Sequence, residues 1–373
     1  MRGLKKVFSL RLGGSRERGA IGVTIGVLIS ASVLLGMGAL VVDVGQLYQE
    51  RAELQNGADA GVLAVAMGCA LGATSCLPAT ADGYVNANAK DGVAGVDLVC
   101  GFTEDGALPT CPASDGAMTS CPDAPPAGTE YAEVHTSTLT DGGSTLLPPA
   151  FARTLLGNES YDGTNVNACA RASWGPPASA VSFAMTISYC EWLQATGDGS
   201  SYAAPPPYPP NPLPSPADDR VLKLHTTTDT VCPSGPAGSD GPGMFGWVDD
   251  PDGNCSVNIN GGTYYDDPGV SAGNACKIAL QTARNNRTTI FVPVYSGSTG
   301  QGSNGVYTLE GFAAFVVTGY RLPGWTASDW LNPANNCGGP DKCINGYFTQ
   351  GLVPAAGTIG GPNLGVSIVQ LTG

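Results

Sequence analysis

The sequence has few groups from which an active site could be built. It holds two histidines, His135 and His225, no pair of cysteines with the C-x-x-C spacing, and no Gly-Lys-Ser/Thr step. Zinc-finger sites and P-loop nucleotide sites need those patterns, so both classes are excluded. A Ser-His-Asp site would have to use one of the two histidines as its base, and each is more simply a strand or surface residue. We therefore predict that the protein is not an enzyme.

Basic residues are also scarce, and they are unevenly distributed. The chain has 17 Lys and Arg against 31 Asp and Glu, which gives a net charge of −14. Residues 1–18 hold six basic residues and one acidic residue (+5), so the remainder holds 11 basic and 30 acidic residues (−19). An acidic body repels nucleic acid, and this charge therefore excludes nucleic-acid binding.

Charged residues are missing altogether from residues 19–42. At about 1.5 Å per residue these 24 residues give roughly 36 Å of helix, enough to cross a bilayer core of about 30 Å. The basic tail, residues 1–18, precedes this run. The sequence therefore predicts a single-pass membrane protein with a cytoplasmic N-terminus and an extracellular body. Cleavage at the small-x-small site 36–38 is the alternative, but the unbroken apolar run favours a retained helix.

Residues 43–70 continue the helix with a different pattern. Apolar residues recur every three or four positions, which predicts an amphipathic helix beyond the membrane. Arg51 and Gln55 interrupt the apolar face of this helix. They either fix the register of a partner helix or extend into solvent.

Small residues recur within the apolar run. Gly22, Gly26 and Ser30 have the small-xxx-small spacing that lets membrane helices approach closely. Glycine is common in such helices, so the spacing alone leaves two interpretations open. If the face is used, it implies a helical partner or a homo-oligomer formed through the N-terminal helix.

Residues 17–66 combine basic residues followed by RGAIGV, a long apolar helix, and VDVGQLYQERAELQNGADAGVLA. This run resembles the N-terminal module of TadE/TadG-like proteins of the tight-adherence (Flp) pilus apparatus. A looser resemblance in the C-terminal half, through ISYCEW, MFGWVDD and CINGYFTQG, is to exported domains of Gram-positive members. The residues that fit the family's pattern beyond the membrane, which we take as candidate partner-helix contacts, are Asp43, Leu47, Arg51, Leu54, Gln55, Ala58 and Asp59.

The resemblance implies a membrane-anchored structural or assembly component of a tight-adherence pilus or a related secretion assembly. Its expected partners are the inner-membrane and pilus-assembly proteins of that system. The alternative is an exported adhesin or ligand-binding module that uses a pilin-like anchor. Some family members carry a D-x-S-x-S metal site for adhesion, and this sequence has none.

All 12 cysteines follow the predicted membrane helix. An even number confined to the exported part predicts disulfides formed in an oxidising compartment, rather than a zinc site. The connectivity is not determined by the sequence. Plausible close pairs are Cys69 with Cys76, Cys255 with Cys276, and Cys337 with Cys343.

The predicted fold class is α+β, with a mostly β exported region. Residues 71–180 are expected to form an exported α/β unit with Cys-rich loops over residues 71–128, and residues 181–373 a β-rich domain interrupted by the Pro-rich stretch 203–216. A short helix is predicted at residues 147–157. Strands are predicted at residues 131–139, 165–174, 221–226, 256–259, 288–295, 306–309, 313–320, 346–350 and 365–371.

Two further motifs have patterns that are found in cofactor or metal sites. Residues 300–305 match G-x-G-x-x-G, but a strand and not a helix is predicted after them, so a hairpin loop is favoured over a dinucleotide site. Asp249, Asp250, Asp252 and Asn254 lie in a turn-forming stretch, with Ca²⁺ binding as the alternative. We predict no cofactor and no metal.

Overall fold

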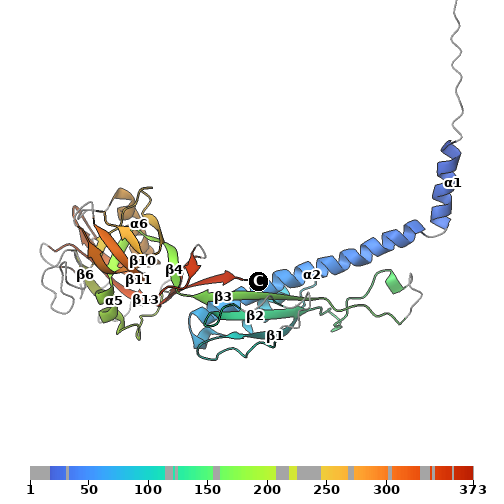
Figure 1. Ribbon diagram of the computed structural model, residues 1–373, viewed down its shortest axis with the longest axis horizontal. Helices are drawn as coiled ribbons and strands as arrows, with labels where there is room; N and C mark the ends of the chain where they lie inside the picture. Colours follow the sequence, from blue (N-terminus) through green and yellow to red (C-terminus); the bar gives the residue numbers. More distant parts are fainter. Residues whose placement is uncertain are drawn as a thin grey trace, which may run out of the picture.

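The computed structural model describes residues 17–30, 33–113, 121, 125–153, 160–206, 218–224, 245–267, 273–300, 305–327, 337, 341–354 and 357–372. Over these residues the protein is a mixed α+β structure with a long N-terminal helix and five disulfides in its β-rich body. Helix α1 and the first half of α2 project from this body (Figure 1).

The apolar run is divided between two helices. α1 spans Glu17–Ser30 and α2 spans Val33–Ala70, whereas the sequence predicts one uninterrupted helix over residues 19–42. α1 has 14 residues, which is about 21 Å of helix. Charged side chains enter α2 from Asp43 onward. Within the described residues, none of the helices combines the length and apolar character needed to cross a membrane.

The second half of α2 lies across a five-stranded sheet. Neighbouring strands of this sheet pair antiparallel, except that β14 and β16 run parallel. Side chains alternate between the two faces of a strand, so Ala132 and Val134 of β2 face α2 while Glu133 faces away. In spatial order the strands are β1 (Gly95–Phe102), β2 (Glu130–Ser137), β3 (Asn167–Gly175), β16 (Val366–Leu371) and β14 (Gly351–Leu352).

Small side chains fill much of the layer between α2 and this sheet. Such residues let the helix backbone approach the strands closely, and each buried CH₂ stabilises the contact by about 0.8 kcal/mol. The apolar face of α2 is therefore used to hold the helix to its own chain. The fully buried members of this layer include Ala58, Val62, Val65, Ala66, Ala132, Val134, Ala170 and Ala172.

A short helix packs against α2 where the composition of residues 71–128 predicts loops. This stretch forms η1 (Ala73–Ser75), α3 (Thr80–Asn88) and strand β1. Ala81 and Val85 of α3 are buried against α2, where Gly57 and Gly61 leave room for them. A helix of nine residues with two buried side chains has too few apolar positions to show a period in the sequence.

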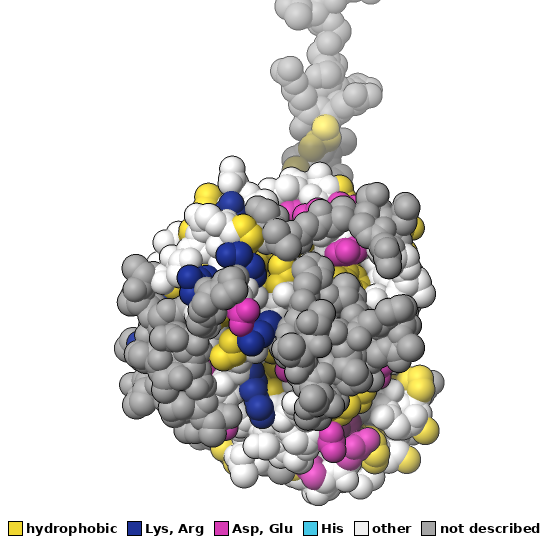
Figure 2. Space-filling view, turned by 90° about the vertical axis from the view of Figure 1, so that its left-hand side faces the viewer, with side chains coloured by type: hydrophobic (Ala, Val, Ile, Leu, Met, Phe, Trp, Pro, Cys, Tyr) yellow, Lys and Arg dark blue, Asp and Glu magenta, His cyan; other side chains and the backbone are white. Residues whose placement is uncertain are grey.

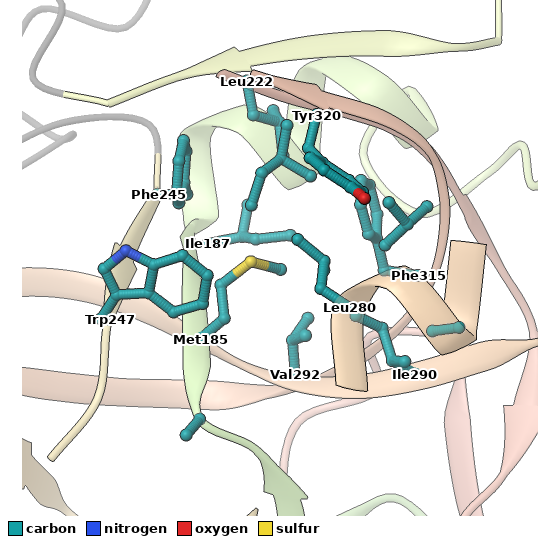
Figure 3. Close-up of a cluster of buried hydrophobic side chains, with 14 of the residues drawn as sticks. Met185, Ile187, Leu222, Phe245, Trp247, Leu280, Ile290, Val292, Phe315 and Tyr320 are labelled. Atoms are coloured by element: carbon teal, nitrogen blue, oxygen red, sulfur yellow. The ribbon is translucent and has the colours of Figure 1, made fainter. Parts of the chain in front are cut away.

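The second and largest sheet lies farther from α1. Two helices, α5 (Tyr189–Thr196) and α6 (Asn274–Asn286), contact it. Figure 3 shows Leu280 of α6 among side chains from several strands, including Ile187 of β5 and Val292 of β10. Its main path is β6 (Arg220–Lys223), β13 (Cys343–Thr349), β11 (Val306–Leu322), β10 (Thr289–Thr299), β5 (Met185–Ser188) and β7 (Phe245–Trp247), and β12 (Trp325–Thr326) and β9 (Thr263–Tyr265) also pair with β11.

A small third sheet joins the two larger ones. It contains β15 (Thr358–Ile359), β4 (Pro177–Phe183) and β8 (Ser256–Asn260). Strand β4 follows β3 almost directly, and the last strand, β16, returns to pair with β3. The C-terminal end of the predicted domain 181–373 thus contributes a strand to the sheet beside α2.

Most of the other predicted strands correspond to strands of the structure. The two predicted at 306–309 and 313–320 form one strand, β11, which runs through Gly311 without a turn. The Pro-rich stretch 203–216 lies outside the described residues from residue 207 onward. The helix predicted at 147–157 is wrong for residues 147–151, which are not helical because the backbone of Leu147 pairs with that of Thr164. Helix begins at residue 152, and residues 154–157 lie outside the described residues.

Candidate functional site

Asp43 stands where α2 leaves the apolar run, and it holds a distant loop against the helix. Its Oδ1 accepts hydrogen bonds from the backbone N–H groups of Ala150 (2.7 Å) and Phe151 (3.0 Å), and its Oδ2 accepts from Phe151 (3.2 Å). Hydrogen bonds to a carboxylate are stronger than those between neutral groups. The loop is therefore fixed beside the last apolar residues of the run.

This loop, residues 146–151, belongs to the connection between β2 and β3, which is described at residues 138–153 and 160–166; we call these described residues the arm and residues 146–151 its tip. The arm starts where Thr138 hydrogen-bonds the Glu50 side chain, and its tip reaches Asp43. Seven residues of α2 separate these two contacts, which is about 10 Å along the helix. The arm therefore runs back along α2 toward α1, as Figure 1 shows.

An open groove lies between the arm and α2. Its volume is about 420 Å³, and residues 164–166 of the arm together with Asn167 of β3 form one wall. The other wall combines apolar, aromatic and cationic side chains of α2. These are Val44, Leu47, Tyr48 and Arg51.

Farther along α2, polar side chains fix the helix on the sheet. Gln55 Nε2 donates to Asp59 Oδ1 (2.9 Å) and to the carbonyl oxygen of Cys169 in β3 (3.0 Å). Thr136 Oγ1 of β2 donates to the carbonyl oxygen of Leu54 (3.2 Å). Gln55, predicted either to contact a partner helix or to extend into solvent, thus has its partners within the chain.

The candidate partner-helix contacts fall into two groups. Leu54 and Ala58 are buried against the chain's own sheet, which leaves neither side chain on the surface. Leu47 is half-buried and Arg51 is exposed, and both line the groove. Surface available to a partner therefore lies in the first turns of α2 after Asp43.

The small-residue face of α1 is open where it is described. No heavy atom lies within 4 Å of the position that a Cβ would take on Gly22 or Gly26. The side chain of Ser30 lies outside the described residues. Another helix could therefore approach α1 closely at the two glycines.

The helical segment that carries Asp43 and the groove also matches a known family. Residues 20–68 match the family model described as "Putative Flp pilus-assembly TadE/G-like". We call residues 20–68 the Tad segment. It contains 49 of the 373 residues (68 − 20 + 1), so the match concerns the helices and not the β-rich body. The comparison with curated proteins found no match, nor did the comparison with solved structures.

The contact between the Tad segment and α3 gives a first testable prediction. A Cβ on Gly57 would lie 3.2 Å from the carbonyl oxygen and 3.3 Å from the Cα of Val85, and these backbone atoms cannot rotate away. We expect Gly57→Leu to lower the free energy of unfolding by about 1–3 kcal/mol, as overpacking does. Urea denaturation followed by circular dichroism measures this loss.

Gly45→Leu is the matched control in the same helix. No heavy atom lies within 4 Å of its Cβ position, and leucine favours a helix over glycine by several tenths of a kcal/mol or more. The free energy of unfolding should therefore stay unchanged or rise. An equal loss in the two variants would contradict a close contact between α2 and α3.

A buried ionic cluster occupies the sheet face opposite α2. Glu133 Oε1 accepts from Arg171 Nε at 2.9 Å, and its Oε2 lies 3.1 Å from His135 Nε2. The guanidinium also lies over the ring of Tyr131, 5.3 Å from its centroid. Burial by itself raises the pKa of the Glu133 carboxyl, but the hydrogen bonds and charges of His135 and Arg171 outweigh it and lower that pKa below its usual 4.5.

In the described part of the chain, side chains that could bind a metal ion gather at this same cluster. One ligand atom from each of Cys121, Glu133, His135 and Cys169 lies within 4.8 Å of the others. Both sulfurs are already bonded to each other in a disulfide. The arrangement as it stands therefore offers a metal one imidazole and one carboxylate, and that carboxylate is paired with Arg171.

Disulfides cross-link the region around the five-stranded sheet and the region around the eight-stranded sheet. The structure joins Cys69 to Cys76, Cys255 to Cys276 and Cys337 to Cys343, which are the three close pairs named from the sequence. It also joins Cys100 to Cys111 and Cys121 to Cys169. Cys111 lies 11 residues after Cys100, in a loop that returns to β1 through a hydrogen bond from the Gly101 N–H to the Pro109 carbonyl oxygen, whereas Cys121 is joined to a residue of β3 that lies 48 positions farther along the chain.

The acidic turn considered for calcium is held by its own backbone. Asp250 Oδ2 accepts the N–H of Cys255 (2.5 Å), and Asn254 Oδ1 accepts the N–H of Ser256 (2.8 Å). Burial, together with the charges of Asp249 and Asp250, raises the pKa of Asp267 nearby. These contacts are those of a turn closed by Asp and Asn side chains.

The remaining sequence motifs assemble no catalytic set within the described residues. Strands β10 and β11 pair antiparallel on either side of residues 300–305, as in a hairpin, and residues 301–304 are not described. Residues 269–273 (GVSAG) have the Gly-x-Ser-x-Gly spacing of a nucleophile elbow, a signal that does not depend on the two histidines. Four of these five residues lie outside the description, and His135 belongs to the other large sheet.

Proposed function

We propose that the protein is a membrane-anchored component of a tight-adherence (Flp) pilus or a related secretion assembly, with a structural or assembly role and no enzymatic one. The observation that carries this proposal is the family match of residues 20–68, which falls on the helices that lead into the body. The disulfides of the body support an oxidising location outside the cytoplasm. The looser C-terminal resemblance favours a Gram-positive type of envelope protein.

The surface of the N-terminal helices supports a membrane anchor. Monomeric soluble proteins rarely expose contiguous apolar patches larger than a few hundred Å². The face of the body in Figure 2 is different, since Lys, Arg, Asp and Glu side chains lie among the apolar ones there. The exposed large apolar side chains of the anchor are Ile21, Val23, Ile25, Val27 and Ile29 on α1 and Met37, Leu40, Val41 and Val42 on α2.

Two surfaces of the anchor are suited to other helical subunits. On α1, Gly22 and Gly26 allow a neighbouring helix to approach closely. On α2, the groove with Leu47 and Arg51 presents apolar area next to a cation. We propose that inner-membrane and pilus-assembly proteins, or a second copy of this chain, pack on these surfaces.

Site-specific photo-crosslinking of the full chain tests the proposal in cells that make the tight-adherence apparatus. A photoreactive residue is placed at Tyr48, which lines the groove and is 73% exposed. A second is placed at Ile278 on α6, which is 66% exposed and belongs to the β-rich body. We expect Tyr48 to give adducts with helical subunits of the apparatus, identified by mass spectrometry, and Ile278 to give none.

The opposite pattern would favour the adhesin alternative. In that case Ile278 or its neighbours would react with a surface ligand while Tyr48 would react with no assembly protein. Absence of tight-adherence components from the Tyr48 adducts counts against an assembly role, because that position stands beside the proposed contact surface.

A further inference from the structure

We infer that the tip of the arm, residues 146–151, is a second membrane contact that lies in the lipid headgroup layer beside the helical anchor. The inference rests on the membrane anchor of the proposed function. It adds a surface that neither the apolar run nor the family match includes, because the tip lies about a hundred residues farther along the chain.

The first step concerns depth. Asp43 is the first charged residue after the apolar residues 19–42, and charged side chains at the end of a membrane helix lie at the interface with water. The backbone nitrogen of Phe151 lies 3.0 Å from Asp43 Oδ1. If residues 19–42 are in lipid, the tip is therefore held at the membrane surface.

The second step concerns the backbone of the tip. An N–H group that enters a lipid environment without a partner costs several kcal/mol. Pro148 and Pro149 have no N–H group, and Asp43 accepts those of Ala150 and Phe151. The two remaining donors are also paired, Leu146 with Ser144 Oγ (3.1 Å) and Leu147 with the carbonyl oxygen of Thr164 (2.9 Å). Every backbone N–H of residues 146–151 is thus satisfied before any lipid is met.

The third step concerns side chains. Residues 146–151 read LLPPAF and carry no charge, and Phe151 is 47% exposed. Phe and Leu are typical of the apolar side of segments that lie in the membrane interface, and burying the exposed part of this ring is favourable by about 25 cal/mol per Å². The next charge beyond the tip is Arg153, which is paired with Asp162 at 3.2 Å.

Lipid is the occupant that the surroundings favour. The tip is hydrogen-bonded to Asp43, which directly follows the exposed apolar side chains of Val41 and Val42 in the proposed membrane surface. A protein subunit would have to cover both the tip and these side chains at the point where the helix enters the bilayer. The lipid headgroup layer covers both without a further component.

Depth-dependent fluorescence quenching of the full-length chain in vesicles tests the inference. The described cysteines are all in disulfides, so one introduced cysteine can be labelled selectively with an environment-sensitive dye. The positions are Phe151→Cys at the tip, Leu40→Cys in the proposed anchor, and Asn56→Cys as a water control. Asn56 lies 13 residues beyond Asp43, which is about 20 Å along α2. The vesicles contain phosphatidylcholine and phosphatidylglycerol, with nitroxide on either the headgroup or the acyl chain.

We expect headgroup nitroxide to quench the Phe151 label strongly, acyl-chain nitroxide to quench the Leu40 label, and neither to quench the Asn56 label. A Phe151 label that behaves like the Asn56 label, with Leu40 quenched, overturns the inference and leaves the anchor in place. An unquenched Leu40 label overturns the anchor of the proposed function and the inference together.

Discussion

Arg171→Met is expected to lower the free energy of unfolding by about 3–5 kcal/mol, because it leaves a buried carboxylate without its cation. The side chains of Arg171 and Glu133 are 4% and 7% exposed, so water cannot replace the lost guanidinium. Methionine retains the length and apolar character of the arginine stem, which isolates the effect of the charge. Guanidinium denaturation at neutral pH measures the loss.

Lys223→Met is the control for this prediction. Lys223 Nζ lies 3.0 Å from Asp341 Oδ2, but these side chains are 38% and 41% exposed. Surface ion pairs of this kind contribute at most about 1 kcal/mol. Comparable losses for the two variants would show that burial does not set the strength of the Glu133–Arg171 pair.

The difference between wild type and Arg171→Met should also depend on pH. The pKa of Glu133 in the folded protein lies below its usual 4.5, with His135 and Arg171 as the cause. Below pH 4.5 the unfolded chain therefore binds this proton before the folded protein does, and the wild type loses stability as the pH falls through the folded pKa. The gap between wild type and Arg171→Met should shrink as the pH falls toward the folded pKa of the wild type, because a protonated Glu133 no longer needs a cation.

Removal of the Cys121–Cys169 disulfide, as the double variant Cys121→Ala/Cys169→Ala, is expected to lower the free energy of unfolding by about 4 kcal/mol. This bond closes a loop with a sequence separation of 48 residues. The entropy that a cross-link removes from the unfolded chain grows with the logarithm of loop length, and a loop of this size corresponds to about 4 kcal/mol. Non-reducing urea denaturation of the two proteins measures the change.

The Cys337–Cys343 bond provides a matched comparison within the same chain. Its sequence separation is six residues, for which the same relation gives about 2 kcal/mol. The variant Cys337→Ala/Cys343→Ala should therefore lose about half as much stability. Equal losses, or a larger loss for the short loop, would contradict control of stability by chain entropy in the unfolded state.

Local pattern was sufficient to predict the elements with a clear period. The three- to four-residue spacing after Asp43 predicted a helix, and α2 has it through Ala70. Runs of branched and aromatic residues predicted β2, β10 and β13 near their observed positions. The sequence did not predict helix α3, because the burial of its side chains depends on Gly57 and Gly61, two residues of another helix.

The candidate site was predicted less well, because its geometry depends on contacts between distant residues. The sequence marks Leu54 and Ala58 as an apolar face, but it does not say whether that face meets another subunit or the chain's own sheet. No local signal relates Asp43 to Phe151, which lies 108 positions away. An uncharged LLPPAF segment that lies far along the chain from an acidic helix residue is at most a weak indication that the two are in contact.

Strand β16 lies between β3 and β14, so the five-stranded sheet beside α2 takes one of its inner strands from Val366–Leu371. This sheet therefore cannot be complete until residues 366–371 have been synthesised, long after β1, β2 and β3. Two covalent connections also lead from this sheet to the eight-stranded sheet, one from β3 through β4 to β5 and one between β13 and β14, which follow each other almost directly in the chain. A force that pulls the eight-stranded sheet away from α2 would be divided between these two connections instead of acting on a single linker.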